Sequence, residues 1–250
     1  MTVANKGILV TGGSSGLGLA CCQQLAKQGA RLAIIDINRE VTDKAVAALK
    51  QTDAKVHAVI GDIVEKTAAY KLVDEAIAKL GRVHGVINAA GVYPRKPILE
   101  ITDADWDFDW GVNVKGTYNV MAAAVEHMRT QPLDGKVRGR IVNVSSVDAF
   151  KAHPKNAHYA ATKAAVVSLT RSFALEFAPD QILINSIAPA GIATDKAKAA
   201  GWLPELASHT PLNRNAEPDD IAEWVTFMLS DANRFMVGEN VIVSGGYVFA

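Results

Sequence analysis

Short apolar runs alternate with longer helical patterns along the whole chain. Seven runs resemble strands, at residues 7–10, 31–36, 56–62, 84–91, 139–146, 182–191 and 241–246. The first three are followed by helical patterns at residues 19–29, 40–51 and 65–81. Strands that alternate with helices of about ten or more residues need crossover connections, which build a parallel sheet covered by helices on both faces. We therefore predict one α/β domain over residues 1–250, a doubly wound parallel sheet of about seven strands.

Residues 190–217 interrupt this alternation between the sixth strand and a helix that begins near Pro218. Open α/β sheets place ligand-covering segments after the carboxyl ends of strands. We therefore expect a substrate-covering loop within the domain. A surface loop with a short helix is the alternative.

The charges balance, with 26 Lys and Arg against 26 Asp and Glu. Nucleic-acid and membrane-surface partners usually need a basic face, so neither is expected. The N-terminal segment has no signal-peptide pattern and no apolar run has membrane-spanning length, which favours the cytoplasm. Cys21 and Cys22 are neighbours in a helical pattern and point to different faces, so we expect two buried thiols in a reducing compartment.

A glycine-rich segment, Thr11–Gly18, separates the first strand from the first helix. Gly12, Gly16 and Gly18 let the backbone approach a pyrophosphate, with the helix N-terminus directed at its charge. Their spacing differs from the G-x-G-x-x-G fingerprint of dinucleotide-binding folds. A tight strand-to-helix connection is the alternative interpretation.

Asp36 ends the second strand, about 20 residues after the glycine-rich segment, where a carboxylate accepts hydrogen bonds from ribose hydroxyls and repels a 2′-phosphate. Neither Ser15 nor Ile37 is basic, which favours NAD over NADP. Arg39 lies close enough for a bent loop to bring it to a phosphate. Asp36 could instead be a helix cap.

Three further motifs are weak signals when each stands alone. Asn88–Gly91 and Ile141–Ser146 end two strands, at the edge of a parallel sheet where ligands bind. Tyr159 and Lys163 are four residues apart, so a helix places them on one face. Such a pair also arises by chance on surface helices.

The order of these motifs is far more specific than any one of them. A Thr-Gly-x-x-x-Gly-x-Gly segment, Asn-Ala-Ala-Gly near residue 90, a serine before Tyr-x-x-x-Lys and a Pro-x-Gly after the sixth strand follow one another. From Gly7 to the C-terminus the sequence resembles the short-chain dehydrogenase/reductase family. The resemblance implies a Rossmann-like fold, an oxidoreductase acting on CH–OH groups with NAD(P), and a homotetramer.

The resemblance also implies a catalytic tetrad: Tyr159 as the acid/base, Lys163 as its partner, Ser146 rather than Ser145, and Asn113. Asp62 would lie beside the adenine and Thr194 against the nicotinamide carboxamide. The full set of implied cofactor-binding residues is Gly12, Ser14, Ser15, Gly16, Leu17, Gly18, Asp36, Ile37, Asp62, Ile63, Asn88, Ala89, Ala90, Gly91, Tyr159, Lys163, Pro189, Ala190, Ile192 and Thr194.

Two positions depart from the family pattern. Ala89 replaces the usual second asparagine and removes side-chain hydrogen bonds that would support the central strand. Ala190 stands between Pro189 and Gly191, where Pro-Gly is commoner. Both changes bear on cofactor affinity rather than on the tetrad.

The predicted mechanism follows from charge. A free tyrosine has a pKa of about 10, and we expect Lys163 and the positive nicotinamide ring to lower the pKa of Tyr159. Tyr159 would then take the proton of the alcohol while Ser146 stabilises charge on the substrate oxygen. Asn113 would position a water that links Lys163 to solvent.

Candidate substrate residues follow the carboxyl ends of the strands: Val92, Tyr93, Asp148, His153, His158 and Trp202. Asp148 would favour a polar or cationic substrate group, or else is a turn residue that faces solvent. We interpret His153 and His158 as loop residues rather than catalysts. No Cys/His cluster has metal-ligand spacing, so no catalytic metal is expected.

The apolar tail with Tyr247, Val248 and Phe249 is expected at a subunit contact, unless it folds back onto its own domain. The sequence thus predicts an NAD-dependent enzyme that interconverts a secondary alcohol and its ketone. The alternatives are an NADP-dependent carbonyl reductase and a dinucleotide-binding regulator without catalysis.

Overall fold

Seven strands form one parallel sheet in the computed structural model, which describes residues 2–52 and 54–249. The sheet order is β3-β2-β1-β4-β5-β6-β7, and every neighbouring pair runs parallel. The strands are β1 (Gly7–Thr11), β2 (Arg31–Asp36), β3 (Val56–Ile60), β4 (Gly85–Asn88), β5 (Gly139–Val144), β6 (Ile182–Pro189) and β7 (Asn240–Val243). The order reverses between β1 and β4, which confirms the predicted doubly wound sheet.

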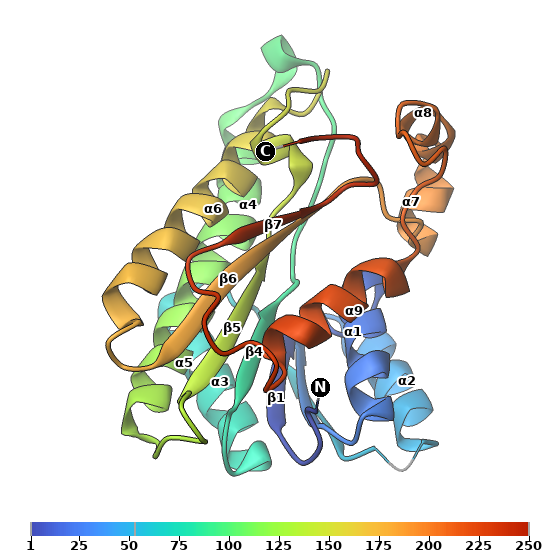
Figure 1. Ribbon diagram of the computed structural model, residues 1–250. Helices are drawn as coiled ribbons and strands as arrows, with labels where there is room; N and C mark the ends of the chain where they lie inside the picture. The colour runs from blue at the N-terminus through green and yellow to red at the C-terminus, as the bar shows by residue number, and fades with distance from the viewer. Residues whose placement is uncertain (1, 53, 250) are drawn as a thin grey trace.

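Helices cover both faces of the sheet (Figure 1). One face carries α1 (Gly16–Lys27), α2 (Arg39–Lys50) and α9 (Pro218–Leu229). The other carries α3 (Lys66–Leu80), α5 (Thr117–Thr130) and α6 (Ala157–Phe177), with α4 (Asp103–Trp110) packed against α6. A π-helical turn, Gly111–Gly116, joins α4 to α5, and 3₁₀ turns lie at Ile98–Glu100 and Val147–Ala149.

The core explains why the strand sequences are mostly apolar. Ile8 and Val10 pack with α1 and α9 on one face, whereas Leu9 packs with α3 and α5 on the other. A side chain buried in this way contributes about 1.5–3 kcal/mol to stability. The thiols of Cys21 and Cys22 are both buried and form no disulfide, as predicted.

Local signals set where the helices begin. Asn38 caps α2, because its side chain accepts a hydrogen bond of 3.1 Å from the amide of Val41. The alternative interpretation of Asp36 as this helix cap is therefore wrong. Thr102 and Asp105 form a capping box that starts α4.

The segment between β6 and α9 folds into two short helices, α7 (Asp195–Ala200) and α8 (Leu203–Ser208). A parallel bridge between Ile192 and Ala216 closes its base. Figure 1 shows both helices beyond the carboxyl ends of the strands.

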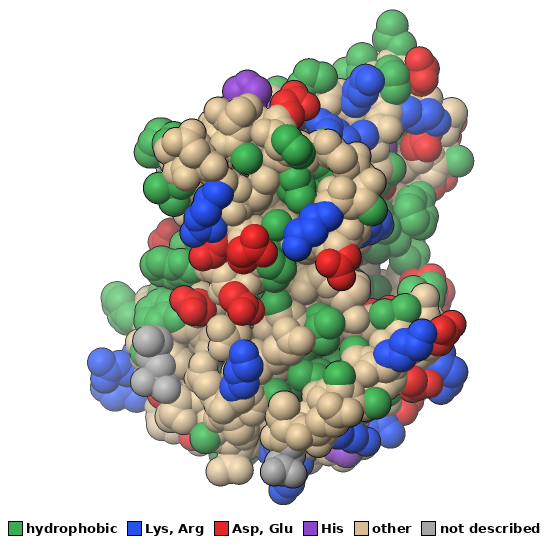
Figure 2. Space-filling model, turned by 90° about the vertical axis from the view of Figure 1, so that its right-hand side faces the viewer, with side chains coloured by type: hydrophobic (Ala, Val, Ile, Leu, Met, Phe, Trp, Pro, Cys, Tyr) green, Lys and Arg blue, Asp and Glu red, His purple; other side chains and the backbone are tan. Residues whose placement is uncertain are grey.

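Acidic and basic side chains are interspersed on the face of the molecule that Figure 2 shows. Within residues 2–52 and 54–249, no helix combines the length and apolarity needed to cross a membrane.

Candidate active site

A cavity of about 860 Å³ opens at the carboxyl ends of the central strands. Its wall includes Asp36 at one end and Ser146, Tyr159 and Lys163 at the other. All the predicted cofactor residues line it except Asn88, and so do the substrate candidates Val92, Tyr93, Asp148, His153 and Trp202. Asn113 and His158 lie outside it. A dinucleotide needs an elongated cleft of this kind at the switch point of the sheet.

The glycine-rich segment has the shape that a pyrophosphate requires. The φ angle of Gly12 is +65°, and a Cβ there would lie 2.7 Å from the backbone of Ala90. A Cβ at Gly18 would collide with the carbonyl oxygen of Gly12. Ser15, the N-cap of α1, makes no side-chain capping bond, and the first turn has no acidic residue. The first amides of α1 are therefore suited to bind a phosphate.

The end of β2 presents Asp36 to the same cavity. The hydroxyl of Ser14 donates a hydrogen bond to its Oδ2, and the amide of Asn38 donates one of 3.1 Å to its Oδ1. Each carboxylate oxygen keeps a second lone pair for another donor. Arg39 begins α2 and does not line the cavity. The structure thus places a carboxylate, rather than a cation, at this end.

Tyr159 and Lys163 lie one turn apart on the inner face of α6, with the Nζ of Lys163 5.6 Å from the centroid of the tyrosine ring. The Nζ donates a hydrogen bond of 2.9 Å to the carbonyl of Val144, the last residue of β5. The hydroxyl of Ser146 accepts one of 3.1 Å from the amide of Asp148 and lines the cavity together with Tyr159. The predicted trio of side chains therefore converges.

In the protein alone the balance of effects raises the pKa of Tyr159, and the expected lowering, which includes the charge of the nicotinamide ring, stays a prediction. Burial raises this pKa well above its usual value, and the charge of Asp148 raises it further, against the opposing hydrogen bond with Ser146. Burial also lowers the pKa of Lys163 to about 8, although Asp109 and Asp148 favour its charged form. A positive charge bound beside Tyr159 would act against this effect of burial.

Asn113 and Asn88 are buried in the framework rather than exposed to the cavity. The Oδ1 of Asn113 accepts a hydrogen bond of 2.9 Å from the amide of Val92, and its Nδ2 donates bonds of 3.0 Å to the carbonyl of Val92 and to the hydroxyl of Thr162. Asn88 donates a hydrogen bond of 2.8 Å to Asn143 and so links β4 to β5. Asn113 therefore fixes the residue that precedes Tyr93, and its predicted role toward a water stays a prediction.

The two departures from the family pattern are accommodated by the backbone. The amide of Ala89 donates a hydrogen bond of 3.2 Å to the carbonyl of Thr11, and that of Ala90 donates one of 3.3 Å to the hydroxyl of Thr11. The amide of Ala190 reaches the carbonyl of Val243 over 3.3 Å. Thr194 caps α7 by accepting from the amide of Ala197.

Asp148 does not face solvent, and its carboxylate has protein partners on both oxygens. His153 contacts Oδ1 through Nδ1, and Asn156 donates a hydrogen bond of 2.6 Å to Oδ2. The Nε2 of His153 meets the hydroxyl of Tyr247, whose ring stacks on the imidazole at 5.6 Å. The interpretation of Asp148 as a solvent-facing turn residue is wrong. Tyr247 folds onto its own domain, whereas Phe249 remains exposed.

His158 is not a loop residue, because it lies in the first turn of α6 and is fully buried beside Asp109. Sequence analysis also missed Arg95, Asn156, Lys196 and Tyr247 on the cavity wall. Arg95 follows Tyr93 by two residues, and Lys196 follows Thr194 by two, so proximity to predicted residues was their only signal.

Comparisons with known proteins give matches over nearly the whole chain. A family model described as enoyl-(acyl carrier protein) reductase matches residues 12–248. The cyclopentanol dehydrogenase of Comamonas testosteroni is 33% identical over 249 residues, which cover 98% of both chains. The meso-2,3-butanediol dehydrogenase of Serratia marcescens is also 33% identical, over 98% of this chain and 96% of its own.

Solved structures extend the likeness to the fold. A short-chain type dehydrogenase/reductase from Mycobacterium ulcerans superposes with a TM-score of 0.91 at 31% identity, over 99% of this chain and 91% of the other. An NAD⁺-bound xylitol dehydrogenase gives 0.90 at 28% identity, over 98% and 100%. Because the family match and these relatives span nearly the whole chain, the protein belongs to the short-chain dehydrogenase/reductase family, and is an oxidoreductase that acts on CH–OH groups with a nicotinamide cofactor.

Proposed function

We propose that the protein is an NAD-dependent dehydrogenase that oxidises a secondary alcohol to its ketone, with Tyr159 as the base. The observation that carries this proposal is that one cavity joins Asp36 to Ser146, Tyr159 and Lys163. Two relatives are dehydrogenases of cyclopentanol and of meso-2,3-butanediol, both secondary alcohols. Their names support the substrate class.

In this proposal the bound dinucleotide supplies the acceptor for the hydride that leaves the carbinol carbon. Ser146 holds the substrate oxygen and offsets the negative charge that develops on it. Tyr159 takes the hydroxyl proton, and the ammonium of Lys163 favours the phenolate beside it. Burial raises the pKa of Tyr159 in the protein itself, so positive charge from the bound cofactor would favour release of its proton.

The choice of NAD depends on Asp36. Its carboxylate lies where the adenosine ribose is expected and would repel a 2′-phosphate. The position of Arg39 off the cavity wall supports the same choice. NADP remains the alternative cofactor, and reduction of a ketone the alternative direction.

The test is formation of reduced cofactor from NAD, and separately from NADP, across a panel of secondary alcohols. Turnover with NAD and weak turnover with NADP is the expected result. Equal or better turnover with NADP would contradict the cofactor assignment. Tight NADH binding without turnover of any alcohol would favour a dinucleotide-binding regulator instead.

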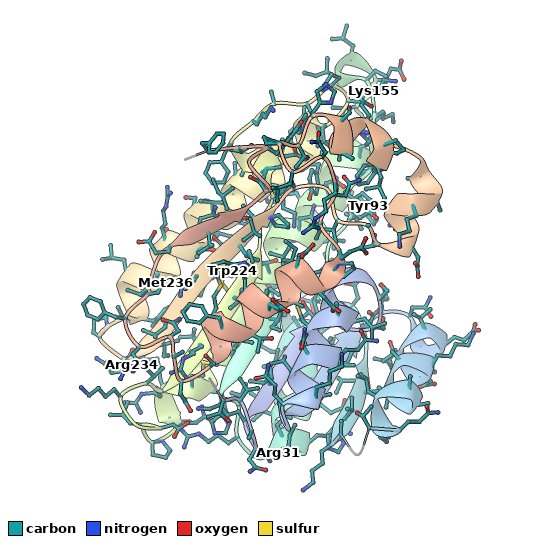
Figure 3. The ribbon with its side chains drawn as sticks, turned by 45° about the vertical axis from the view of Figure 1, so that its right-hand side comes forward. Arg31, Tyr93, Lys155, Trp224, Arg234 and Met236 are labelled. Atoms are coloured by element: carbon teal, nitrogen blue, oxygen red, sulfur yellow. The ribbon has the colours of Figure 1, made fainter. Side chains whose placement is uncertain are left out.

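We also propose a cytoplasmic homotetramer. Large apolar side chains are exposed on two sides, with Trp106, Phe108 and Trp110 on α4, and Trp224 and Phe235 at α9 and the segment after it. Figure 3 shows Trp224 and Met236 on the same side of the molecule. Subunit contacts would remove these surfaces from water. The mass in solution by light scattering tests the assembly, and a monomer would contradict it.

A further inference from the structure

The end of the cavity next to Tyr159 has an aromatic wall. The ring of Tyr93 meets that of Tyr159 edge to face, with 6.5 Å between centroids. It also meets the indole of Trp202 edge to face, with 6.5 Å between centroids. Tyr93 follows β4, and Trp202 precedes α8, so Tyr93 lies beside the helices that cover this end of the sheet (Figure 3). An apolar substrate body fits such a wall.

Two cations lie on this wall. The Nζ of Lys196 is 4.7 Å from the centroid of the Tyr93 ring, and the guanidinium carbon of Arg95 is 6.0 Å from that of Trp202. Both residues line the cavity. Cation–π contact holds such groups over a ring and leaves their N–H donors available.

Neither cation forms a salt bridge with a described carboxylate (residues 2–52 and 54–249), since none lies within 4.0 Å of it. Lys96, the neighbour of Arg95, shows the contrast, because its Nζ lies 2.6 Å from Asp105. Arg95 and Lys196 are therefore cations beside the reacting end of the cavity that form no salt bridge with a described carboxylate.

None of the acidic residues that line the described part of the cavity forms a salt bridge with Arg95 or Lys196, although the charge of Asp148 acts on Tyr159. Both carboxylate oxygens of Asp148 are already engaged by His153 and Asn156. Asp195 directly precedes Lys196 in α7, is exposed and forms no salt bridge with it. Asp36 and Asp62 belong to the opposite end of the predicted cofactor cleft.

We propose that the substrate is a hydroxy acid, a secondary alcohol joined by an apolar body to a carboxylate that Arg95 and Lys196 bind. This inference rests on the proposed dehydrogenase function and names its substrate class. The carbinol lies at Ser146 and Tyr159, the apolar body lies against Tyr93 and Trp202, and the carboxylate accepts hydrogen bonds from the two cations. Hydrogen bonds from charged donors are stronger than those from neutral donors. The two cations therefore supply most of the enzyme's selectivity for the acid.

The same cations would also suit the phosphates of the dinucleotide. The experiment therefore has to distinguish binding of the substrate carboxylate from binding of the cofactor phosphates. Hydroxy acids of increasing chain length are each paired with their carboxamide, which keeps the shape and removes the charge. kcat and KM are measured with saturating NAD for both members of each pair, and the KM for NAD is measured separately.

Three variants complete the design. Lys196→Met and Arg95→Met keep an aliphatic stem over the aromatic rings and remove the charge. Lys198→Met is the matched control, because Lys198 lies on the same short helix, is exposed and does not line the cavity. It is expected to behave like the unaltered protein.

The expected result is a KM about tenfold lower for the best acid than for its carboxamide, a preference lost in Lys196→Met or Arg95→Met and kept in Lys198→Met. Equal KM values for acid and carboxamide would overturn the inference and leave the dehydrogenase function in place. A Lys196→Met variant in which only the KM for NAD rises would assign the lysine to the cofactor and overturn it as well. No turnover of acids, carboxamides or simple secondary alcohols would overturn the proposed function itself.

Discussion

The Nε2 of His158 lies 3.6 Å from the Oδ2 of Asp109, and neither side chain is exposed to solvent. Within the described part of the chain, the side-chain polar atoms of both residues have no hydrogen-bond partner. His158 directly precedes Tyr159, and the charge of Asp109 favours the charged form of Lys163. Burial raises the pKa of Asp109 to about 6, against the attraction of His158, so a titratable carboxyl lies behind the predicted catalytic residues.

Replacing Asp109 by Asn should change how stability depends on pH. A carboxyl whose pKa is higher in the folded state stabilises the fold below its usual pKa, and this contribution is lost as pH rises through about 6. The unfolding free energy of the unaltered protein should therefore fall by on the order of 1–3 kcal/mol between about pH 4 and pH 7 because of Asp109. Asp109→Asn should not show this fall. Urea unfolding at both pH values measures the difference.

Asp105 provides the control for this experiment. Its bond to Lys96 lowers its pKa, so its contribution is present above the usual pKa and is lost as pH falls. Asp105→Asn should therefore be less stable than the unaltered protein at neutral pH, and this difference should shrink as the pH falls. If the unfolding free energies of Asp109→Asn and the unaltered protein changed with pH in parallel, the pKa of Asp109 would not be raised in the folded state.

Removing the charge of Asp36 should relax the choice of cofactor. In Asp36→Asn the repulsion of a 2′-phosphate is gone, while the hydroxyl of Ser14 still has an amide oxygen to bond. The ratio of kcat/KM for NAD to that for NADP should fall at least about tenfold, which corresponds to about 1.4 kcal/mol. Asp43→Asn on the exposed side of α2 is the matched control. An unchanged ratio would show that Asp36 does not select the cofactor.

Tyr247 should act on substrate binding rather than on chemistry. Tyr247→Phe keeps the ring against His153 and removes the hydroxyl that meets Nε2, a loss of about 1 kcal/mol in stability. Because His153 lines the cavity, we expect KM for the alcohol to rise a few-fold with kcat nearly unchanged. Tyr118→Phe, on α5, controls for the loss of a phenol elsewhere. A fall in kcat at constant KM would contradict this role.

The fold and the cofactor end of the cavity follow from local sequence signals. Uninterrupted apolar runs such as Leu32–Ile35 are typical of strands buried on both faces, and the structure has β2 over Arg31–Asp36. Gly12 and Gly18 are needed for close approaches of the backbone, which a glycine pattern indicates directly. These features depend on neighbours in sequence, so one chain is enough to predict them.

The substrate end was not predictable in the same way. His153 meets Tyr247 across 94 residues, and the partner of His158 is 49 residues away on another helix. Arg95 lies over the ring of Trp202 and Lys196 over that of Tyr93, and these contacts form only in the folded chain. In the protein alone the pKa of Tyr159 is raised mainly by burial, an effect that inspection of nearby charges in the sequence does not include.

Tyr159→Phe tests the central claim most directly, because it removes only the hydroxyl that is proposed to take the proton. NAD reduction by the best secondary alcohol is compared in the variant and the unaltered protein, and NADH binding is measured in both by fluorescence. The account predicts that turnover falls at least about a hundredfold while NADH binding is retained, since a general base contributes on that order. Turnover in Tyr159→Phe equal to that of the unaltered protein would contradict the assignment of Tyr159 as the base.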